Sequence, residues 1–215
     1  MIQPAFMFMV GVALPYSYAR RAARGDSYFA RFLHSVWRSL VLVLLAVYLS
    51  TNSGAKQTNW GFTNVLAQIG LGYPILFLFV NKPRWLQYAA VALIGAGTWI
   101  AFYQHPLPPA EFDYQTVGLT EKQLAENKAD FVPEGMKQHW AYNTNFAAVQ
   151  DRVILNWFPR ETPFEYNVGG YATLNFVPSL MTMLLGLIVG EMLRSAGTHG
   201  DKLKRLAILA VVCLV

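Results

Sequence analysis

The chain has 215 residues, of which 54% are hydrophobic and 13% charged, and its formal net charge is +5. Soluble chains average about 25% charged residues, so this composition excludes an ordinary soluble domain and a disordered chain. The single cysteine, Cys213, excludes an internal disulfide framework and a cysteine-ligated zinc site. Most basic residues fall between long apolar runs, which indicates a role in membrane topology and not in nucleic-acid binding.

Five apolar segments are long enough for transmembrane helices, because about 20 helical residues cross a bilayer core of about 30 Å. A sixth apolar run starts near Leu206 and reaches Val215, about half that length. The sequence therefore predicts an all-α polytopic membrane protein with five full transmembrane helices, a truncated sixth, and one extracytoplasmic helical segment. Its parts are a four-helix segment (1–103), an extracytoplasmic loop (104–171) and a final part (172–215). The five segments are Ile2–Ala19, Phe32–Ser50, Phe62–Val80, Trp85–Tyr103 and Ala172–Leu193.

The basic residues near the segment ends predict the orientation, because cytoplasmic loops of membrane proteins are enriched in Lys and Arg. Three of the connections are basic, and taking them as cytoplasmic places residues 104–171, with nine acidic and five basic residues, outside. The basic residues concerned are Arg20, Arg21, Arg24, Arg31, Lys82, Arg84, Arg194, Lys202, Lys204 and Arg205.

The first apolar segment begins at residue 2 with its positive charges after it, which is not the pattern of a signal peptide. Together with the half-length final run, this favours an interior piece of a larger membrane protein over a natural short form.

Polar residues lie at helical spacing within two apolar segments. One stripe is Asn175, Ser179, Thr182, Gly186 and Gly190; the other is Asn64, Gln68 and Gly72. Two interpretations remain open. The small residues favour close helix packing, whereas the amides and hydroxyls favour a lined cavity or polar path, formed by Asn64, Gln68, Asn175, Ser179 and Thr182.

Arg38 lies one to two turns inside the second apolar segment. It either extends to the headgroups or anchors an anionic cofactor, because guanidinium binds phosphate in a bidentate manner. Glu191, near the end of the fifth segment, is expected to pair with a neighbouring arginine.

The predicted extracytoplasmic loop (104–171) contains two sequence patterns that indicate helices. Thr120–Gln123 has the form of a capping box, opening a helix to about Ala129. A longer amphipathic helix is predicted from about Gln138 to Trp157, ended by Pro159, on the membrane surface or above a cavity. Its apolar face is Phe146, Val149, Val153 and Trp157.

One row of that predicted helix carries His139, Asn143 and Asp151, and Arg152 follows. Imidazole can accept a proton, carboxylate can orient it, and amides can bind sugar hydroxyls. His139 and Asp151 are therefore candidate catalytic residues, and Asn143, Asn145 and Arg152 are candidate acceptor-binding residues. The alternative is a solvated helix face with a local ion pair. No metal-ligand spacing is present.

Several motifs follow one another in an order and spacing typical of one membrane-protein family. They are Gln3-Pro4-Ala5-Phe6-Met7-Phe8-Met9-Val10-Gly11, Trp37-Arg38-Ser39, Asn64-Val65-Leu66-x-Gln68-Ile69-Gly70, Asn145 through Asp151-Arg152, and Gly169-Gly170 followed by the helical pattern to Gly190. With these motifs the chain resembles bacterial membrane proteins similar to heparan-α-glucosaminide N-acetyltransferase. Phe158–Gly190 looks especially like a bacterial subgroup known only as a domain of unknown function.

The resemblance implies a multi-span enzyme of a bacterial inner membrane that moves acetyl from cytoplasmic acetyl-CoA to an amino sugar on the opposite face. It implies acetyl-CoA as co-substrate, no metal, a saccharide acceptor, no nucleic acid, and leaves a homo-oligomer open. Arg20, Arg21 and Arg38 would bind the CoA phosphates. The family's catalytic histidine would precede Met1, and Ala67-Gln68 stands where better-known members have Gln-Arg.

Other functions fit the same residues. The enzyme could acylate oxygen instead of nitrogen on an envelope glycan. A transporter or flippase for a small solute or lipid-linked sugar would use the polar stripes as its path, although no carboxylate or lysine lies mid-span. A non-catalytic membrane scaffold is the third alternative.

Overall fold

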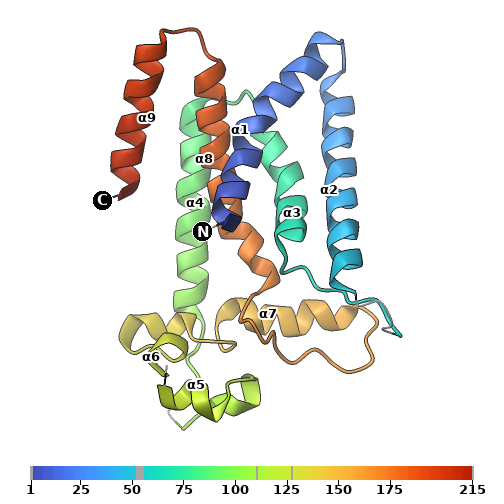
Figure 1. Ribbon diagram of the computed structural model, residues 1–215, viewed down its shortest axis with the longest axis vertical. Coiled ribbons are helices and arrows are strands. Elements are labelled where there is room, and N and C mark those ends of the chain that lie inside the picture. Colours follow the sequence, from blue (N-terminus) through green and yellow to red (C-terminus); the bar gives the residue numbers. More distant parts are fainter. Residues whose placement is uncertain (1, 52–55, 110, 127, 215) are drawn as a thin grey trace.

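The computed structural model describes residues 2–51, 56–109, 111–126 and 128–214, and every regular element in these ranges is helical. Six long helices run side by side along the long axis of the molecule (Figure 1). They are α1 (Ile2–Ala23), α2 (Tyr28–Ser50), α3 (Val65–Leu78), α4 (Arg84–Gln104), α8 (Phe176–Arg194) and α9 (His199–Leu214).

The two ends of this bundle differ in character. At one end, here named the basic end, short connections join α1 to α2, α3 to α4, and α8 to α9 (Figure 1). At the other, here named the polar end, residues 105–172 form short helices. These are η1 (Tyr114–Val117), α5 (Glu121–Glu126), α6 (Lys128–Phe131), η2 (Gly135–Trp140), α7 (Phe146–Ile154) and η3 (Leu155–Trp157); η4 (Thr173–Asn175) then leads directly into α8.

Three helical segments are long and apolar enough to cross a membrane: Tyr28–Ser50, Arg84–Gln104 and Thr173–Arg194. This confirms the helical class and three of the five predicted spans. α3 is shorter than predicted, because its 14 residues extend only about 21 Å. α1 has 22 residues but is not among the three.

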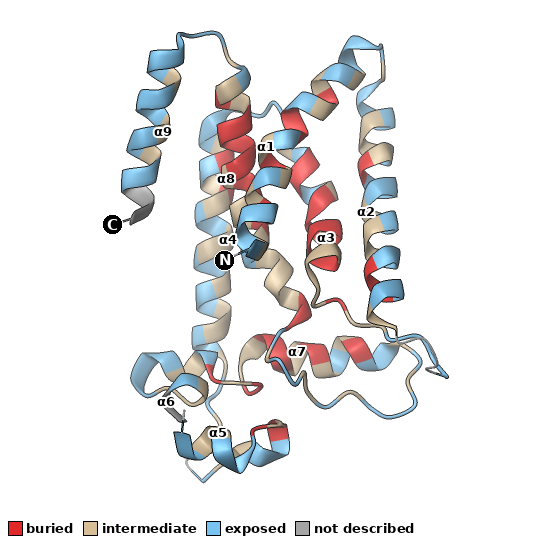
Figure 2. Cartoon of the chain, in the orientation of Figure 1, coloured by how far each residue is buried: buried red, intermediate tan, exposed pale blue. Residues whose placement is uncertain are grey.

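The core is built on a contact between α1 and α8 in which backbone touches backbone. A Cβ atom added to Gly11 would overlap the carbonyl oxygen of Met183, and one added to Gly186 would overlap that of Phe8. Gly190 meets the backbone of Val12 in the same way. The small-residue stripe of α8 therefore does pack against a neighbouring helix, and buried residues gather on α1, α3 and α8 (Figure 2).

α3 packs against α2 through a second close contact. The Ser39 hydroxyl donates to the Gly70 carbonyl at 2.7 Å, and a Cβ atom on Gly70 would meet the side chain of Val43. Asn64 caps α3 by accepting from the Ala67 N–H at 2.9 Å, and its amide donates to the Ala46 carbonyl of α2 at 3.1 Å. The amide that begins the predicted stripe on α3 thus joins two helices.

At the polar end, one of the two predicted helix signals is confirmed and the other is wrong. The capping box is present, because Gln123 Oε1 accepts from the Thr120 N–H at 2.9 Å and Thr120 Oγ1 accepts from the Gln123 N–H at 3.3 Å. The long helix predicted from Gln138 to Trp157 is wrong. Asn143 adopts a positive φ of 51°, which interrupts a helix, and Asn145 then caps the shorter α7.

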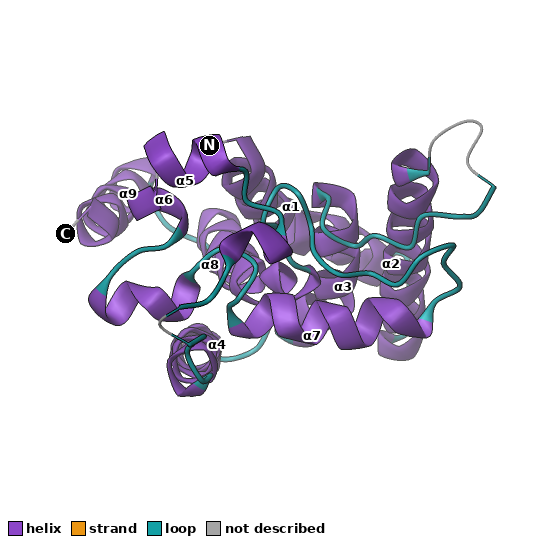
Figure 3. Ribbon diagram, turned by 90° about the horizontal axis from the view of Figure 1, so that it is seen from below, coloured by secondary structure: helices purple, strands orange, loops and turns teal. Residues whose placement is uncertain are grey.

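The buried face of α7 also differs from the predicted one. The helix lies crosswise to the long helices at the polar end (Figures 1 and 3). Its buried residues are Ala147, Ala148 and Asp151, whereas Val153 is 50% exposed. Trp157, which follows in η3, is 76% exposed. The apolar row read from the sequence therefore faces outward in part, as suits a helix at a membrane surface.

The α1–α8 contact predicts a sharp difference between two glycines. Replacing Gly186 by Ala should lower the unfolding temperature of the protein in detergent, because overpacking costs about 1–3 kcal/mol. The same change at Gly97 in α4, where nothing lies within 4 Å of the added Cβ, should leave stability unchanged or slightly raised. Equal effects at both positions would contradict the close contact.

Candidate functional site

A cleft lies between α1, α2 and α3 in the half of the bundle nearer the basic end, here named the inner cleft. Its volume is about 200 Å³, and one cation faces it. The guanidinium carbon of Arg38 lies 5.2 Å from the centre of the Tyr73 ring, a cation–π distance. The lining residues are Val10, Ala13, Leu14, Ser17, Arg38, Leu42, Ile69 and Tyr73.

Arg38 is deeper in its helix than the sequence indicated. α2 begins at Tyr28, ten residues before Arg38, so the side chain originates about 15 Å along the helix. Where the structure describes the chain, the one ion pair is that of Arg21 with Asp26 at 3.3 Å, so Arg38 has no carboxylate partner there. Arg38 is exposed at the side of α2. A charge at this position of a membrane-spanning helix is costly, which makes Arg38 a candidate functional residue.

The mouth of the inner cleft carries further basic groups. On α2, His34 lies one turn before Arg38, and its ring centre is 6.5 Å from that of Tyr18 on α1. Arg21 follows Tyr18 by three residues and is half-buried, whereas Arg20 is exposed. Of the three predicted cofactor-binding residues, only Arg38 lines the cleft.

A second cavity, here named the outer cavity, lies between the start of α1 and the first half of α8. Its volume is about 310 Å³. Beside it, the buried Gln68 of α3 accepts hydrogen bonds at Oε1 from Gln3 at 2.7 Å and from Ser179 at 3.1 Å. Gln68 Nε2 donates to the Thr63 carbonyl at 3.0 Å. The lining residues are Gln3, Pro4, Met7, Tyr171, Asn175, Pro178, Ser179 and Thr182.

The predicted polar path is assembled in part. Gln68 and Ser179 meet, and Asn175 and Thr182 line the outer cavity beside them. Asn64 does not join them, because its side chain is bonded to α2 and to the start of α3.

One face of α1 lines both cavities. It carries Gln3 and Met7 at the outer cavity and Val10, Leu14 and Ser17 at the inner cleft. Met7 and Leu14 are each 1% exposed, so packed side chains separate the two spaces. Sequence reasoning missed Gln3 and Ser17, although these two polar residues lie on one face of an apolar helix, about 21 Å apart along its axis.

Three predicted acceptor-binding residues hold the polar end together. The buried Asn143 amide donates to the carbonyls of Val117 at 3.0 Å and Asn167 at 2.9 Å. Arg152 donates to the Asn143 carbonyl at 2.6 Å and to that of Glu165 at 2.7 Å. Asn145 caps α7 through the Ala148 N–H. These contacts join α7 and the residues before it to Val117, Glu165 and Asn167.

The two candidate catalytic residues lie on different elements with separate partners. His139, in η2, places Nδ1 3.2 Å from the His105 carbonyl oxygen, and its ring lies 4.9 Å from that of Tyr103. Asp151, on α7, is 1% exposed and accepts from the Thr173 N–H at 2.8 Å. Neither residue lines the inner cleft or the outer cavity.

Burial raises the pKa of the Asp151 carboxyl above its ordinary value, and the bonds to Thr173 and the charge of Arg160 only partly oppose this. The carboxyl joins α7 to the residues that lead into α8. Arg160 makes a further connection, because it donates to the Leu155 carbonyl at 2.7 Å and to the Trp60 carbonyl at 2.5 Å.

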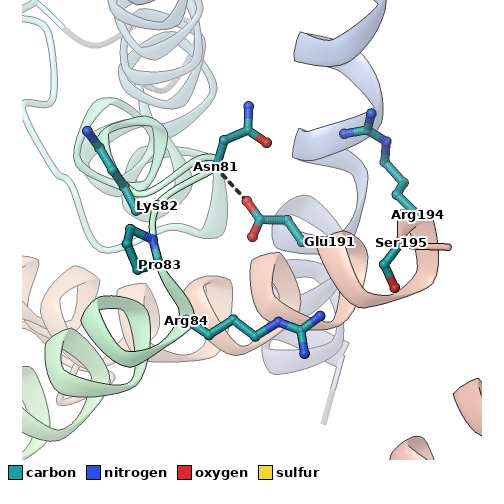
Figure 4. A pocket seen from close by; sticks show the side chains of 7 residues that line it. All are labelled: Asn81, Lys82, Pro83, Arg84, Glu191, Arg194 and Ser195. Atoms are coloured by element: carbon teal, nitrogen blue, oxygen red, sulfur yellow. Dashed lines mark hydrogen bonds between the residues drawn. The ribbon is translucent and has the colours of Figure 1, made fainter.

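A carboxylate at the basic end has a different partner from the one expected. Glu191 accepts from the backbone N–H of Asn81 at 2.7 Å (Figure 4). It also accepts from the Gln87 amide at 2.9 Å. Within the described ranges no arginine pairs with it, so the predicted ion pair is wrong. Gln87, a fully buried amide in an apolar helix, supplies the bond that an arginine was expected to make.

Over the described residues, no group of three or more His, Cys, Asp or Glu side chains gathers in a way that could hold a metal ion. No model of a known protein family matches the chain, and no curated protein matches it significantly. The inner cleft, the outer cavity and the α1 face between them are therefore the candidate functional site on the grounds of geometry.

The buried Asp151 predicts a pH dependence. Because its folded pKa is raised, its contribution to stability is complete below about pH 3.9, the unfolded value, and is lost as the pH rises through the folded pKa. The unfolding temperature of the wild type, measured from pH 4 to 7, should therefore fall relative to that of Asp151→Asn.

The control for this measurement is Glu126→Gln, which neutralises an exposed carboxyl on α5 and should run parallel to the wild type. Comparing the slopes of unfolding temperature against pH removes any constant effect of the Asn side chain on stability. Parallel curves for wild type and Asp151→Asn would show that the Asp151 carboxyl does not titrate abnormally.

Proposed function

We propose that the chain forms part of an integral membrane acyltransferase. In this proposal an acetyl group passes from acetyl-CoA at the basic end to an amino sugar or other glycan at the polar end. The observation that carries the proposal is the single face of α1 that lines both cavities, a cationic one nearer the basic end and a neutral polar one nearer the other. A transfer across a membrane needs two such spaces, for donor and acceptor, with a barrier between them.

In the proposed topology the basic end is cytoplasmic, following the excess of Lys and Arg in its three connections. α1 and α3 then complete five spans, and residues 104–171 lie outside a bacterial inner membrane. α3 covers only part of the bilayer thickness, and its first turn packs among α2, Phe62 and Leu155 and not against lipid.

The donor site is the inner cleft with its mouth. Arg38 supplies a guanidinium group for phosphate, which guanidinium binds in a bidentate manner. Arg21, which is paired with Asp26 at 3.3 Å, keeps further donors for the phosphates at the mouth. Beyond Arg38 the lining is apolar, with Val10, Leu14 and Ile69. This arrangement suits an anionic carrier whose uncharged acyl arm points inward.

The acceptor site is the outer cavity. Asn175 and Thr182 offer an amide and a hydroxyl there, groups that bind sugar hydroxyls. Asn143, Asn145 and Arg152 are already bonded to backbone groups of the polar end, so in this proposal they shape the segment that covers the cavity.

In the transfer itself, the acceptor nitrogen or oxygen attacks the thioester carbonyl. A C–N or C–O bond forms, the C–S bond breaks, and CoA leaves as the thiolate. A base takes the acceptor proton and returns it to the sulfur, which gives the free thiol. Neither His139 nor Asp151 faces the two cavities, so the proposal assigns the base to neither residue.

Replacing Arg38 by Ala in the intact protein should weaken acetyl-CoA binding by about tenfold or more, because a hydrogen bond to a charged group contributes about 1.5–3 kcal/mol. Equilibrium binding to protein in lipid nanodiscs measures this. Arg24→Ala removes an equal charge from an exposed position at the same end and should have little effect. Unchanged affinity in Arg38→Ala would refute the donor site.

The same stacked cavities also suit a transporter or flippase, in which the solute itself would pass Met7 and Leu14. The two functions differ in what crosses the membrane. Acetyl transfer moves label from acetyl-labelled CoA onto an acceptor inside sealed vesicles, whereas transport accumulates an unmodified labelled sugar without acetyl-CoA.

A further inference from the structure

A separate pocket opens at the basic end, where the turn between α3 and α4 meets the last turn of α8 (Figure 4). We name it the turn pocket. Its volume is about 460 Å³, and it shares no residue with the inner cleft or the outer cavity. Cationic side chains outnumber the carboxylate by three to one. The lining residues are Asn81, Lys82, Pro83, Arg84, Glu191, Arg194 and Ser195.

The turn is held in place by hydrogen bonds to Glu191 and Gln87. Asn81 adopts a positive φ of 58°, and its N–H is bound by Glu191 at 2.7 Å. The second carboxylate oxygen of Glu191 accepts from Gln87, whose amide also donates to the Phe79 carbonyl at 3.0 Å. The Glu191 carboxylate thus fixes the turn. The Asn81 N–H and the Gln87 amide partly compensate its charge.

The cationic side chains around the turn keep hydrogen-bond donors that are free to bind a ligand. In the part of the chain that the structure describes, neither Lys82 nor Arg84 has a carboxylate within ion-pair distance. Arg84 extends alongside Glu191, whereas Lys82 points to the other side of the turn (Figure 4). Arg194 donates one N–H to the Pro15 carbonyl at 2.8 Å, which leaves further guanidinium donors.

The start of α4 adds to the positive potential of the turn pocket. Pro83 occupies the N-cap position and makes no side-chain capping bond. Backbone N–H groups in the first turn of a helix are then left to other acceptors, and the helix dipole favours an anion there.

The depth of the turn pocket in a membrane follows from its two walls. α4 and α8 both belong to segments of spanning length and composition, so their ends at the turn lie at headgroup level. Trp85, in the first turn of α4, is 69% exposed, and exposed tryptophans gather at the membrane–water interface. Basic pockets between helices at this level are where anionic lipid headgroups bind.

We propose that the turn pocket binds the phosphate headgroup of an anionic membrane lipid. Arg84 and Arg194 contact the phosphate oxygens, Lys82 on the other side of the turn adds to the positive potential, and the acyl chains lie along the exposed side of α4. A soluble phosphate has the same charge chemistry, but it would gain nothing from Trp85 and the apolar surface of α4. This inference does not depend on the acyltransferase proposal.

The test uses the full chain in detergent and the double variant Lys82→Gln, Arg84→Gln. Both residues are exposed, so the fold should be unaffected, and the unfolding temperature without added lipid checks this. Added phosphatidylglycerol should stabilise the wild type, and its apparent affinity should drop about tenfold or more in the variant. Native mass spectrometry should show fewer retained phosphatidylglycerol molecules.

The matched control is Lys204→Gln, Arg205→Gln on α9, which removes two exposed cations from the same end and should bind like the wild type. Phosphatidylcholine should not stabilise any form. Equal loss in both double variants would overturn the proposal in favour of unspecific charge attraction. Full stabilisation by inorganic phosphate alone, dependent on Lys82 and Arg84, would overturn it in favour of a soluble ligand.

Discussion

The backbone contact between α1 and α8 determines the geometry of the interior. With Gly11 against Met183 and Gly186 against Phe8, the two helices approach as closely as backbones allow. No side chain can fill the seam, so the rotation of α1 about its axis is fixed. That rotation directs Gln3, Met7, Leu14 and Ser17 toward the two cavities. Lipid tails are as apolar as the helix surfaces, so the hydrophobic effect does not bring helices together inside a bilayer. Close packing of this kind is then a principal source of helix association.

Two polar side chains help to attach the polar end to this interior. Asp151 binds the backbone just before α8, and Arg160 binds the Trp60 carbonyl in the segment between α2 and α3. α7 is therefore positioned relative to α8 on one side and to α2 and α3 on the other. Movement of one helix pair against the other would strain both contacts, so α7 and η3 connect the helices across the polar end of the bundle.

The pattern of apolar and small residues in the sequence was sufficient to predict that the long helices exist and that the small-residue stripe of α8 packs. A 3.6-residue repeat of apolar and small residues reports which face packs, and Gly186 and Gly190 do pack. The capping box at Thr120 was equally readable, because it depends on residues three positions apart. These features share one property: the interacting groups are close in sequence, or the pattern repeats over several turns.

The remaining features depend on single residues and distant partners. The helical spacing of apolar residues predicted one continuous helix through Asn143. The backbone of Asn143 lies instead in the left-handed region, and its amide is bonded to the carbonyls of Val117 and Asn167, so η2 and α7 are separate. The face of α7 was misjudged for a related reason, since Asp151 is buried by its bond to a residue 22 positions away. Glu191 was assigned an arginine by charge alone, whereas the buried Gln87 lay closer.

The cations of the basic end fall into two environments with different consequences. Arg38 originates about 15 Å along α2 and faces the apolar inner cleft beside Tyr73, where a surrounding bilayer would exclude water and strengthen the attraction of a bound anion. Lys82 and Arg84 lie at the surface around a turn fixed by Glu191, where water and salt weaken each contact and several cations must act together. A ligand that must be held for chemistry suits the first environment, and a lipid that exchanges with the bilayer suits the second. The depth of each charge, and not its sign alone, therefore separates the two sites.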